Sequence, residues 1–175
     1  MIIGSGGAGK STFARSLGEK LTIPVYHLDQ LLWEPNWVNV PDEKEQKIQH
    51  NLVQKDKWII DGNYGSTIDI RLKAADVVIF LDLSRFLCIY RVLKRNIKYR
   101  NQSRPDMREG CIEKLDLKFL QWIWQYPRTR KPKIIQKLQS LPQSKKVIIL
   151  RSRKEVREYL EEIGPADLKV KGHTP

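Results

Sequence analysis

One segment near the start of the chain has the composition and spacing of a phosphate-binding loop. Residues 4–11, GSGGAGKS, match the pattern G-x-x-x-x-G-K-[ST] in full, and Thr12 follows. Small residues at all four variable positions let the backbone approach a ligand closely, and successive N–H groups of such a loop can surround an anion. The alternative is a glycine-rich turn with an incidental Lys-Ser pair. An apolar segment before the loop and an amphipathic one after it favour phosphate binding.

Each part of this loop has a chemical role. Lys10 can bridge the β- and γ-phosphates of a nucleoside triphosphate, and the Ser11 hydroxyl can ligate Mg²⁺. A helix beginning near Lys10 adds the partial positive charge of its N-terminus. ATP, or another nucleoside triphosphate, is therefore the expected cofactor together with Mg²⁺. The residues predicted to bind it are Gly4, Ser5, Gly6, Gly7, Ala8, Gly9, Lys10, Ser11 and Thr12.

Two carboxylates follow predicted strands, at the edge of a parallel sheet where ligands bind. Asp61 ends an apolar strand, and we predict that it supports Mg²⁺; the alternative is a turn, which Asp-Gly also signals. Asp29 follows another strand. It either takes a proton from, or orients, an acceptor hydroxyl, or it caps the next segment, and the sequence leaves both open. His27 is interpreted as a half-buried histidine with satisfied hydrogen bonds rather than a catalyst.

The elements that must position these residues alternate between strands and helices. Strands are predicted at 1–4, 24–28, 58–61, 76–83 and 145–150. Helices are predicted at 10–21, 41–53, 86–99, 112–126, where Pro127 would stop the helix, 131–141 and from the capping box at Ser152 to Gly164. Residues 29–40 and 101–110 are predicted loops. This alternation predicts a three-layer α/β/α fold around a five-stranded parallel sheet, with one domain at 1–165 and a flexible tail at 166–175.

The composition excludes several classes of protein. With 175 residues, 41% of them hydrophobic and 30% charged, the chain is typical of one soluble globular domain. No apolar run approaches the ~18 residues of a membrane span, and the first residues lack the features of a secretory signal. Cys88 and Cys111 are too few for a disulfide framework. We therefore expect a cytoplasmic protein without a membrane partner.

The charge is distributed unevenly. The net charge is +12, but residues 1–84 hold 9 Lys or Arg against 11 Asp or Glu, and residues 85–175 hold 23 against 9. A basic surface of this kind attracts nucleotide phosphates, nucleic acid or acidic lipid, and charge alone does not choose among them. Zinc spacing, a basic zipper and an RNP sequence are all absent, which weakens the nucleic-acid interpretation without removing it.

Four motifs give the chain a resemblance to a known family. They are GSGGAGKST at 4–12, HLDQLLWEPNW at 27–37, WIIDGNY at 58–64 and RPDM…EGC…WIWQYPRTR at 104–130. With them, the chain resembles the adenylate-kinase-like group of P-loop nucleotide kinases and, more narrowly, the bacterial DNA topology modulation (FlaR-related) proteins. The resemblance covers nearly the whole chain. It implies a P-loop NTPase fold with a small helical lid at about 100–130.

The resemblance also implies site residues in the basic half. In related kinases, an Arg-x-x-x-Arg pair on the helix before the lid contacts adenine and phosphates, and here this pair is Arg91 and Arg95. At least one of Arg128 and Arg130, after the lid helix, would contact phosphate. For any single arginine, the alternative is a solvated basic face. Mutual repulsion of these bases predicts a lid that is open without triphosphate. The implied catalytic residues are Lys10, Asp29, Arg91, Arg95, Arg128 and Arg130.

The implied activity is transfer of the γ-phosphoryl group of ATP to a small-molecule acceptor. Residues 61–65 read DGNYG where adenylate kinases proper have DGFPR, and the missing Pro and Arg argue against AMP as the acceptor. Trp33 and Trp37 either form the wall of a pocket for a planar or apolar acceptor or anchor their loop to the core. Two alternatives stay open: a nucleic-acid-associated protein regulated by nucleotide, and a P-loop domain without turnover.

Overall fold

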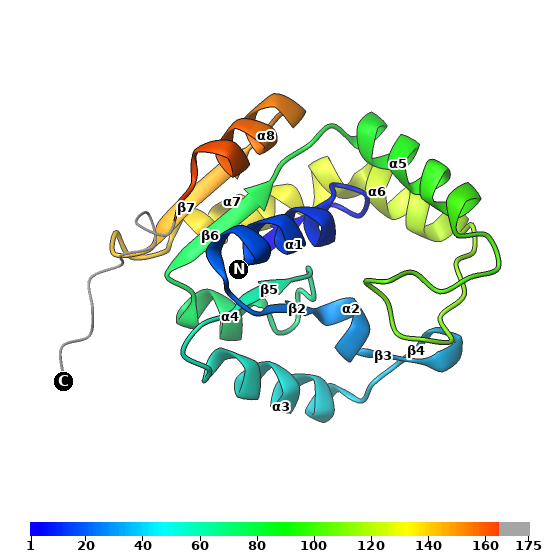
Figure 1. Cartoon of the computed structure of the whole chain (residues 1–175), viewed down its shortest axis with the longest axis horizontal. Coiled ribbons are helices and arrows are strands. Elements are labelled where there is room, and N and C mark those ends of the chain that lie inside the picture. Colours follow the sequence, from blue (N-terminus) through cyan, green and yellow to red (C-terminus); the bar gives the residue numbers. More distant parts are fainter. Residues whose placement is uncertain (165–175) are drawn as a thin grey trace.

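A five-stranded parallel sheet lies at the centre of the computed structural model, which describes residues 1–164 (Figure 1). Its strands follow the order β2-β5-β1-β6-β7, and β1 is the middle strand. Their bounds are β1 (Ile2–Gly4), β2 (Val25–His27), β5 (Ile59–Asp61), β6 (Val77–Leu81) and β7 (Lys146–Leu150). The predicted sheet is therefore confirmed. The predicted flexible tail at 166–175 lies outside the described residues.

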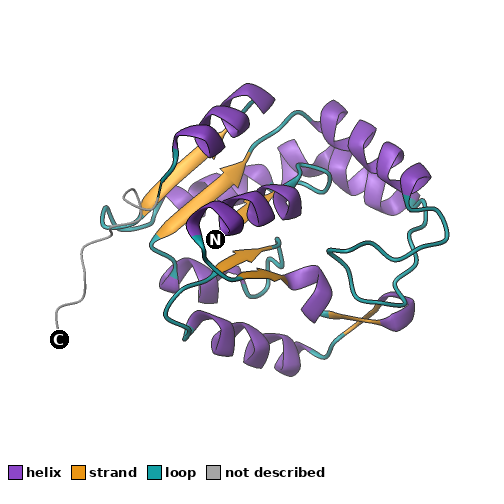
Figure 2. Cartoon of the chain, viewed as in Figure 1, coloured by secondary structure: helices purple, strands orange, loops and turns teal. Residues whose placement is uncertain are grey.

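Helices cover both faces of this sheet (Figure 2). Side chains alternate between the faces along each strand because a strand has a period of two. One set packs beneath α1 (Lys10–Leu21) and α8 (Arg153–Glu162) and includes Ile2, Ile79 and Leu81. The other packs beneath α4 (Ile68–Ala74) and α7 (Lys131–Gln139) and includes Ile3, Val78 and Phe80. A smaller cluster joins β5 to α3 (Asp42–Val53). The predicted three-layer fold is thus confirmed.

Two further helices, α5 (Arg85–Lys98) and α6 (Leu117–Thr129), lie side by side at the end of the molecule (Figure 1). Phe86, at the start of α5, meets Trp124, toward the end of α6, with ring centroids 5.6 Å apart, so the two helices run antiparallel. Cys88 and Val92 of α5 and Ile123 of α6 are buried in the same core as α1. Helix α6 is therefore part of the core, and the segment that can serve as a lid narrows to the loop at 99–116.

The prediction for 112–126 was wrong at both ends of the helix. The helix begins only at Leu117, where the Asp116 side chain accepts hydrogen bonds from the backbone N–H groups of Lys118 and Phe119. It then continues through Pro127 to Thr129. Proline removes one hydrogen bond near a helix end, and here the last turn persists. The chain bends at Arg130, which directly precedes α7.

Two other segments also differ from the predictions. Residues 29–40 are not a plain loop: they contain α2 (Leu28–Leu31), then strands β3 (Trp33–Glu34) and β4 (Val38–Asn39), joined through the 3₁₀ turn η1 (Pro35–Trp37). Asn36 and Trp37 adopt positive φ angles of 64° and 63°, which reverse the chain between two very short strands. Helix α4 was not predicted because seven residues are too few for a clear periodicity. Among residues 1–164, every helix is too short or too polar to cross a membrane.

Candidate active site

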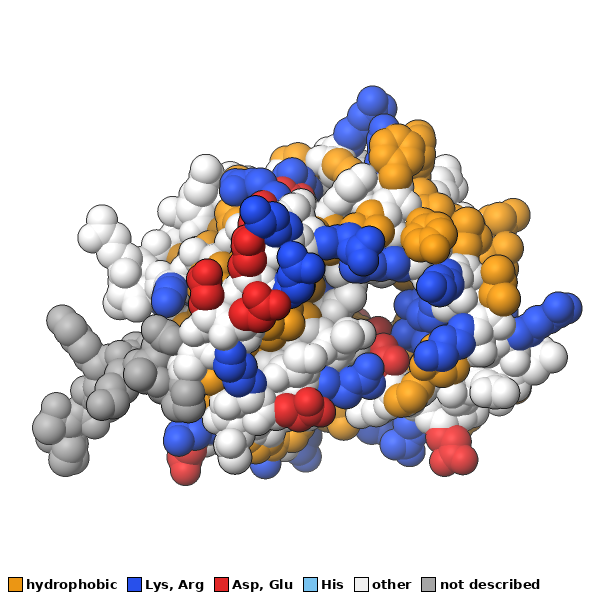
Figure 3. Space-filling model, turned by 45° about the horizontal axis from the view of Figure 1, so that its top comes forward, with side chains coloured by type: hydrophobic (Ala, Val, Ile, Leu, Met, Phe, Trp, Pro, Cys, Tyr) orange, Lys and Arg blue, Asp and Glu red, His pale blue; other side chains and the backbone are white. Residues whose placement is uncertain are grey.

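A cavity of about 900 Å³ lies at the carboxyl ends of the central strands, where the phosphate loop leaves β1. Residues 6–12 of the loop line one side of it, Arg91 and Arg95 enter from α5, and Trp33 and Trp37 enter from the hairpin. Figure 3 shows Lys and Arg side chains around the mouth of a hollow on this side of the molecule. A cavity of this size lies within the usual ~300–1,000 Å³ of small-molecule sites.

The phosphate loop has the backbone of an anion site. Gly9 precedes α1 in a left-handed conformation with φ 92°, and no side chain of the described part of the chain caps the helix, so its first N–H groups face the loop. Gly7 also has a positive φ, 76°, and a Cβ there would lie 2.3 Å from the Cys88 carbonyl oxygen. Lys10 Nζ donates to the Ser5 carbonyl at 3.1 Å, and Arg91 Nη1 donates to the Ala8 carbonyl at 2.8 Å.

Ser11 and Asp61, the predicted magnesium residues, are in contact. The Ser11 hydroxyl lines the cavity and donates to Asp61 Oδ2 at 2.9 Å, while Asp61 is 3% exposed behind it. Within residues 1–164, no three His, Cys, Asp or Glu side chains form a metal cluster. One hydroxyl and one carboxylate still fit Mg²⁺, which keeps several waters and takes few protein ligands.

His27 holds the other oxygen of this carboxylate. Its Nδ1 lies 2.5 Å from Asp61 Oδ1, and the ring is buried, as the interpretation of a satisfied histidine expects. Burial opposes protonation of the imidazole, but the hydrogen bond to Asp61 and the charge of that carboxylate outweigh it and raise the pKa of His27. His27 thus orients Asp61 toward Ser11.

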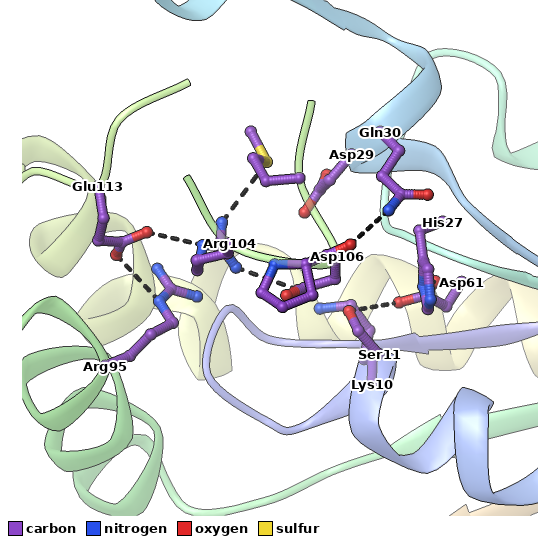
Figure 4. A network of polar contacts seen from close by, with 12 residues as sticks. Lys10, Ser11, His27, Asp29, Gln30, Asp61, Arg95, Arg104, Asp106 and Glu113 are labelled. Carbon is purple, nitrogen blue, oxygen red and sulfur yellow. Dashed lines mark hydrogen bonds and ion pairs between the residues drawn. The ribbon is translucent and has the colours of Figure 1, made fainter. Parts of the chain in front are cut away.

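Asp29 lies on the other side of the cavity from the phosphate loop (Figure 4). It sits in the first turn of α2, and its Oδ1 accepts a hydrogen bond from the Tyr64 hydroxyl at 2.8 Å. Burial raises the pKa of Tyr64, and the charge of Asp29 and this hydrogen bond raise it further, so the phenol stays protonated and donates. Trp33 and Trp37 meet edge to face nearby, with ring centroids 5.6 Å apart.

A buried arginine that the sequence analysis missed positions the segment after β5. Arg71, on α4, is fully buried and donates to the carbonyls of Gly62 and Asn63, both at 2.7 Å, and of Tyr64 at 3.2 Å. Burial lowers its pKa to about 10. Asn63 Oδ1 in turn accepts from the Gly4 N–H at 3.1 Å, which links this segment to the phosphate loop. A single basic residue in an unpredicted helix offers no sequence signal for this role.

Two acidic residues that the sequence analysis also missed neutralise the arginines of the cavity. Glu113 pairs with Arg95 Nε at 3.0 Å and with Arg104 Nε at 2.7 Å (Figure 4). Arg104 Nη1 also lies 3.1 Å from Asp106 Oδ2. All four side chains line the cavity. Of the arginines expected to repel one another, Arg95 is thus paired with a carboxylate of this loop.

The loop at 99–116 crosses the mouth of the cavity instead of standing open. Besides the Arg95–Glu113 pair, Gln30 of α2 donates to the Pro105 carbonyl at 2.5 Å, and Trp37 Nε1 donates to the Ile112 carbonyl at 2.8 Å. In this arrangement the loop carries its own counter-charges and its own hydrogen bonds to α2 and the hairpin. The opening of a lid without triphosphate stays a prediction.

The structure brings together most, but not all, of the residues singled out from the sequence. Residues 6–12, Asp29, Arg91 and Arg95 line one cavity, with Asp61 directly behind Ser11. Gly4 and Ser5 lead into the loop without lining the cavity. Arg128 and Arg130 are exposed where α6 meets α7, and neither lines the cavity.

Comparison with known proteins shows a shared fold with kinases. A sugar kinase from Janibacter sp. HTCC2649, solved without ligand, aligns with a TM-score of 0.51 at 15% identity, over 98% of this chain and 96% of its own. A presumed kinase from Chloroflexus aurantiacus aligns with a TM-score of 0.52 at 14% identity, over 91% and 94%. No protein-family model and no curated protein sequence matches the chain. The chain therefore shares the α/β fold of these kinases and carries a phosphate loop after β1.

Proposed function

We propose that this protein is a Mg²⁺-dependent phosphotransferase that moves the γ-phosphoryl group of ATP, or of another nucleoside triphosphate, to a hydroxyl group of a small acceptor. The observation that carries the proposal is that the phosphate loop and Asp29 line the same cavity from different sides. The two lie close enough for their charges to interact. Burial lowers the pKa of Lys10, while the charges of Asp29 and Asp61 act in the opposite direction.

The nucleotide would bind along the loop. The backbone N–H groups of residues 6–12 and the N-terminus of α1 would hold the β- and γ-phosphates, with Lys10 between them. Ser11, hydrogen-bonded to Asp61, would ligate Mg²⁺. A bound Mg²⁺ would neutralise part of the phosphate charge. Arg91 already contacts the loop through the Ala8 carbonyl, so its guanidinium stands beside the phosphates.

Asp29 would act on the acceptor. Because Tyr64 occupies Oδ1, the second oxygen of the carboxylate is left to accept the proton of an acceptor hydroxyl. The acceptor oxygen forms a bond to the γ-phosphorus, the bond from that phosphorus to the β–γ bridging oxygen breaks, and the proton passes to Asp29. Once its ion pair with Glu113 is broken, Arg95 would stabilise the charge of the transferred group. Arg128 and Arg130, which lie outside the cavity, have no part in this scheme.

The acceptor side favours an uncharged molecule that has a free hydroxyl and a ring that packs on indole, such as a sugar or a nucleoside. Two indole rings, a phenol and one carboxylate line it, from Trp33, Trp37, Tyr64 and Asp29. The neighbouring base, Arg104, is paired with Glu113 and Asp106, so it is not free to bind an acceptor phosphate. The narrower resemblance to DNA topology modulation proteins rests on sequence motifs alone, and no separate feature of the site favours a nucleic-acid role.

Phosphoryl transfer from labelled ATP to a panel of sugars, nucleosides and nucleoside monophosphates, with and without Mg²⁺, tests the proposal. Calorimetry with ATP and Mg²⁺ on Lys10→Ala should show loss of nucleotide binding with an unchanged circular dichroism spectrum, and Lys133→Ala, on α7, is the control. Equal affinity of Lys10→Ala and the wild type would contradict the assignment. Transfer to monophosphates alone would contradict the acceptor class. DNA binding with a steep salt dependence and no transfer would favour the nucleic-acid alternative.

A further inference from the structure

Helices α5 and α6 present an apolar face that nothing in the described chain covers. On α5, the spacing i, i+4, i+7, i+11 places four large side chains on one side, with exposures from 39% for Leu93 to 78% for Ile97; they are Phe86, Tyr90, Leu93 and Ile97. On α6, Leu117 and Trp124, seven residues apart, are 74% and 45% exposed. These six residues are called the α5–α6 face.

The opposite side of α5 packs into the core. The exposed apolar face therefore does not result from an incorrect rotation of the helix about its axis. Cys88 and Val92 are buried against α1 and α6, and Arg91 and Arg95 point into the cavity. Ile89 is also apolar and lies next to this exposed side of α5, but it packs against the core. An amphipathic helix normally buries its apolar stripe once. Helix α5 has one buried stripe and a second that faces solvent.

The α5–α6 face is continuous across the two helices. The rings of Phe86 and Trp124 meet edge to face, and the Arg85 guanidinium lies 3.9 Å from the Trp124 ring centroid. Because the helices run antiparallel, Ile97 and Leu117 lie toward the other end of the same pair. Figure 3 shows hydrophobic side chains gathered beside the hollow, on the side where Figure 1 places α5 and α6.

The area of this face fits a protein interface. If each of these large side chains exposes about 200 Å² when fully accessible, the exposed fractions correspond to roughly 700 Å² of surface, most of it apolar. Soluble monomers rarely expose a contiguous patch above about 300–600 Å². A stable interface of standard size buries about 800 Å² on each partner.

We infer that the α5–α6 face binds the same face of a second copy of this chain, in a two-fold symmetric dimer. A pair of antiparallel helices is self-complementary, because two such pairs pack as a four-helix bundle, and an isologous interface needs one patch only. The six residues of the face are uncharged, as is typical of the core of homodimer interfaces, and the charged group in contact with them is the Arg85 guanidinium stacked on Trp124. Lys94 and Lys98, both exposed, follow its edge and stay in solvent, where salt screens their repulsion.

The dimer would also reach the cavity. Arg91 and Arg95 project from the cavity side of the helix whose other side forms the interface. A second copy would therefore contact the solvent side of α5, while Glu113 of the loop binds Arg95 on its cavity side. The inference does not depend on phosphotransfer, because the face would associate whether or not the cavity binds nucleotide.

Sedimentation velocity of the full chain across 1–100 µM tests the inference, with Ile97→Gln/Leu117→Gln as the disrupting variant. Both side chains are mostly exposed, so their replacement removes little core and the variant should keep its circular dichroism spectrum. We expect a wild-type dimer and an increase of at least tenfold in the dissociation constant of the variant. Val38→Gln, an exposed apolar residue of the hairpin, is the matched control and should leave the dimer unchanged.

The dependence of binding on salt concentration distinguishes self-association from binding to a charged partner. Raising NaCl from 50 to 500 mM should leave the dimer as tight or tighter, because it screens the lysines and strengthens apolar burial. A wild-type monomer at all concentrations, or a dimer that persists in the double variant, would overturn the inference. Monomers that instead bind vesicles of anionic lipid, weakened by salt and by the double variant, would also overturn it and identify a membrane surface as the occupant.

Discussion

Arg95 and Glu113 form an ion pair inside the candidate active site, with Arg95 Nε 3.0 Å from Glu113 Oε1. The other carboxylate oxygen of Glu113 lies 2.7 Å from Arg104 Nε, so one acid on the loop at 99–116 binds two arginines. Glu113 is almost fully buried, and Arg104 is buried with it. The carboxylate thus stands where the proposed function places phosphate charge near Arg95, and a bound triphosphate has to compete with it.

Glu113→Gln should lower the free energy of unfolding by about 3 kcal/mol, because two arginines lose a buried counter-charge. Urea unfolding measures this change, and Glu109→Gln, an exposed acid of the same loop, is the control. Hydrogen exchange over 99–116 should become faster in Glu113→Gln than in the wild type. Unchanged exchange and unchanged stability together would show that the pair does not hold the loop.

Asp29 and Asp61 should have separable roles. Asp29→Asn keeps the shape of the side chain and its contact with Tyr64, so nucleotide binding should persist while the transfer rate falls by ~10²–10⁴, the range for a lost general base. Asp61→Asn should weaken the Mg²⁺-dependent part of nucleotide binding because it changes the partner of Ser11. Calorimetry with and without Mg²⁺, together with transfer assays, separates the two. Loss of nucleotide binding in Asp29→Asn would refute this division of roles.

Arg71→Met should destabilise the protein by about 3 kcal/mol or more, because three backbone carbonyls and the Gln49 side chain lose a buried donor. Arg71→Lys keeps the charge but loses the planar guanidinium, so it should lower the free energy of unfolding by less than Arg71→Met does. Thermal and urea unfolding measure both variants. If Arg71 positions residues 62–64 as well as stabilising them, Arg71→Lys should also weaken nucleotide binding under conditions where it stays folded.

Glu155 should make the start of α8 sensitive to acid. The Arg151 N–H and the Ser152 hydroxyl donate to its carboxylate, and these hydrogen bonds hold the pKa of Glu155 below its usual value of 4.5. The stabilisation is therefore present above the unfolded pKa and is lost as pH falls through the lower folded pKa. Glu155→Gln should lower the melting temperature at pH 7, and its difference from the wild type should shrink as pH falls through the lowered pKa of folded Glu155. Glu162→Gln, at the exposed end of α8, is the control.

Local patterns along the chain were enough to determine the sheet and the position of the phosphate loop. Buried strands such as Val77–Leu81 appear as apolar runs, and a loop built from Gly4 to Ser11 needs its small residues next to one another. Asp29 and Asp61 could be singled out because each lies at or just after the carboxyl end of a strand, and parallel strands end at one edge. These features depend on neighbours in the sequence.

Tertiary structure alone decided the contacts between distant segments. Arg71 reaches the carbonyls after β5 because α4 folds back over them, and Glu113 meets Arg95 because the loop at 99–116 returns to α5. The same folding leaves Arg128 and Arg130 outside the cavity and leaves the apolar side of α5 uncovered. A periodic pattern reports that a helix has an apolar side, but not which element, or which second copy, covers it, because burial is a property of the packed chain.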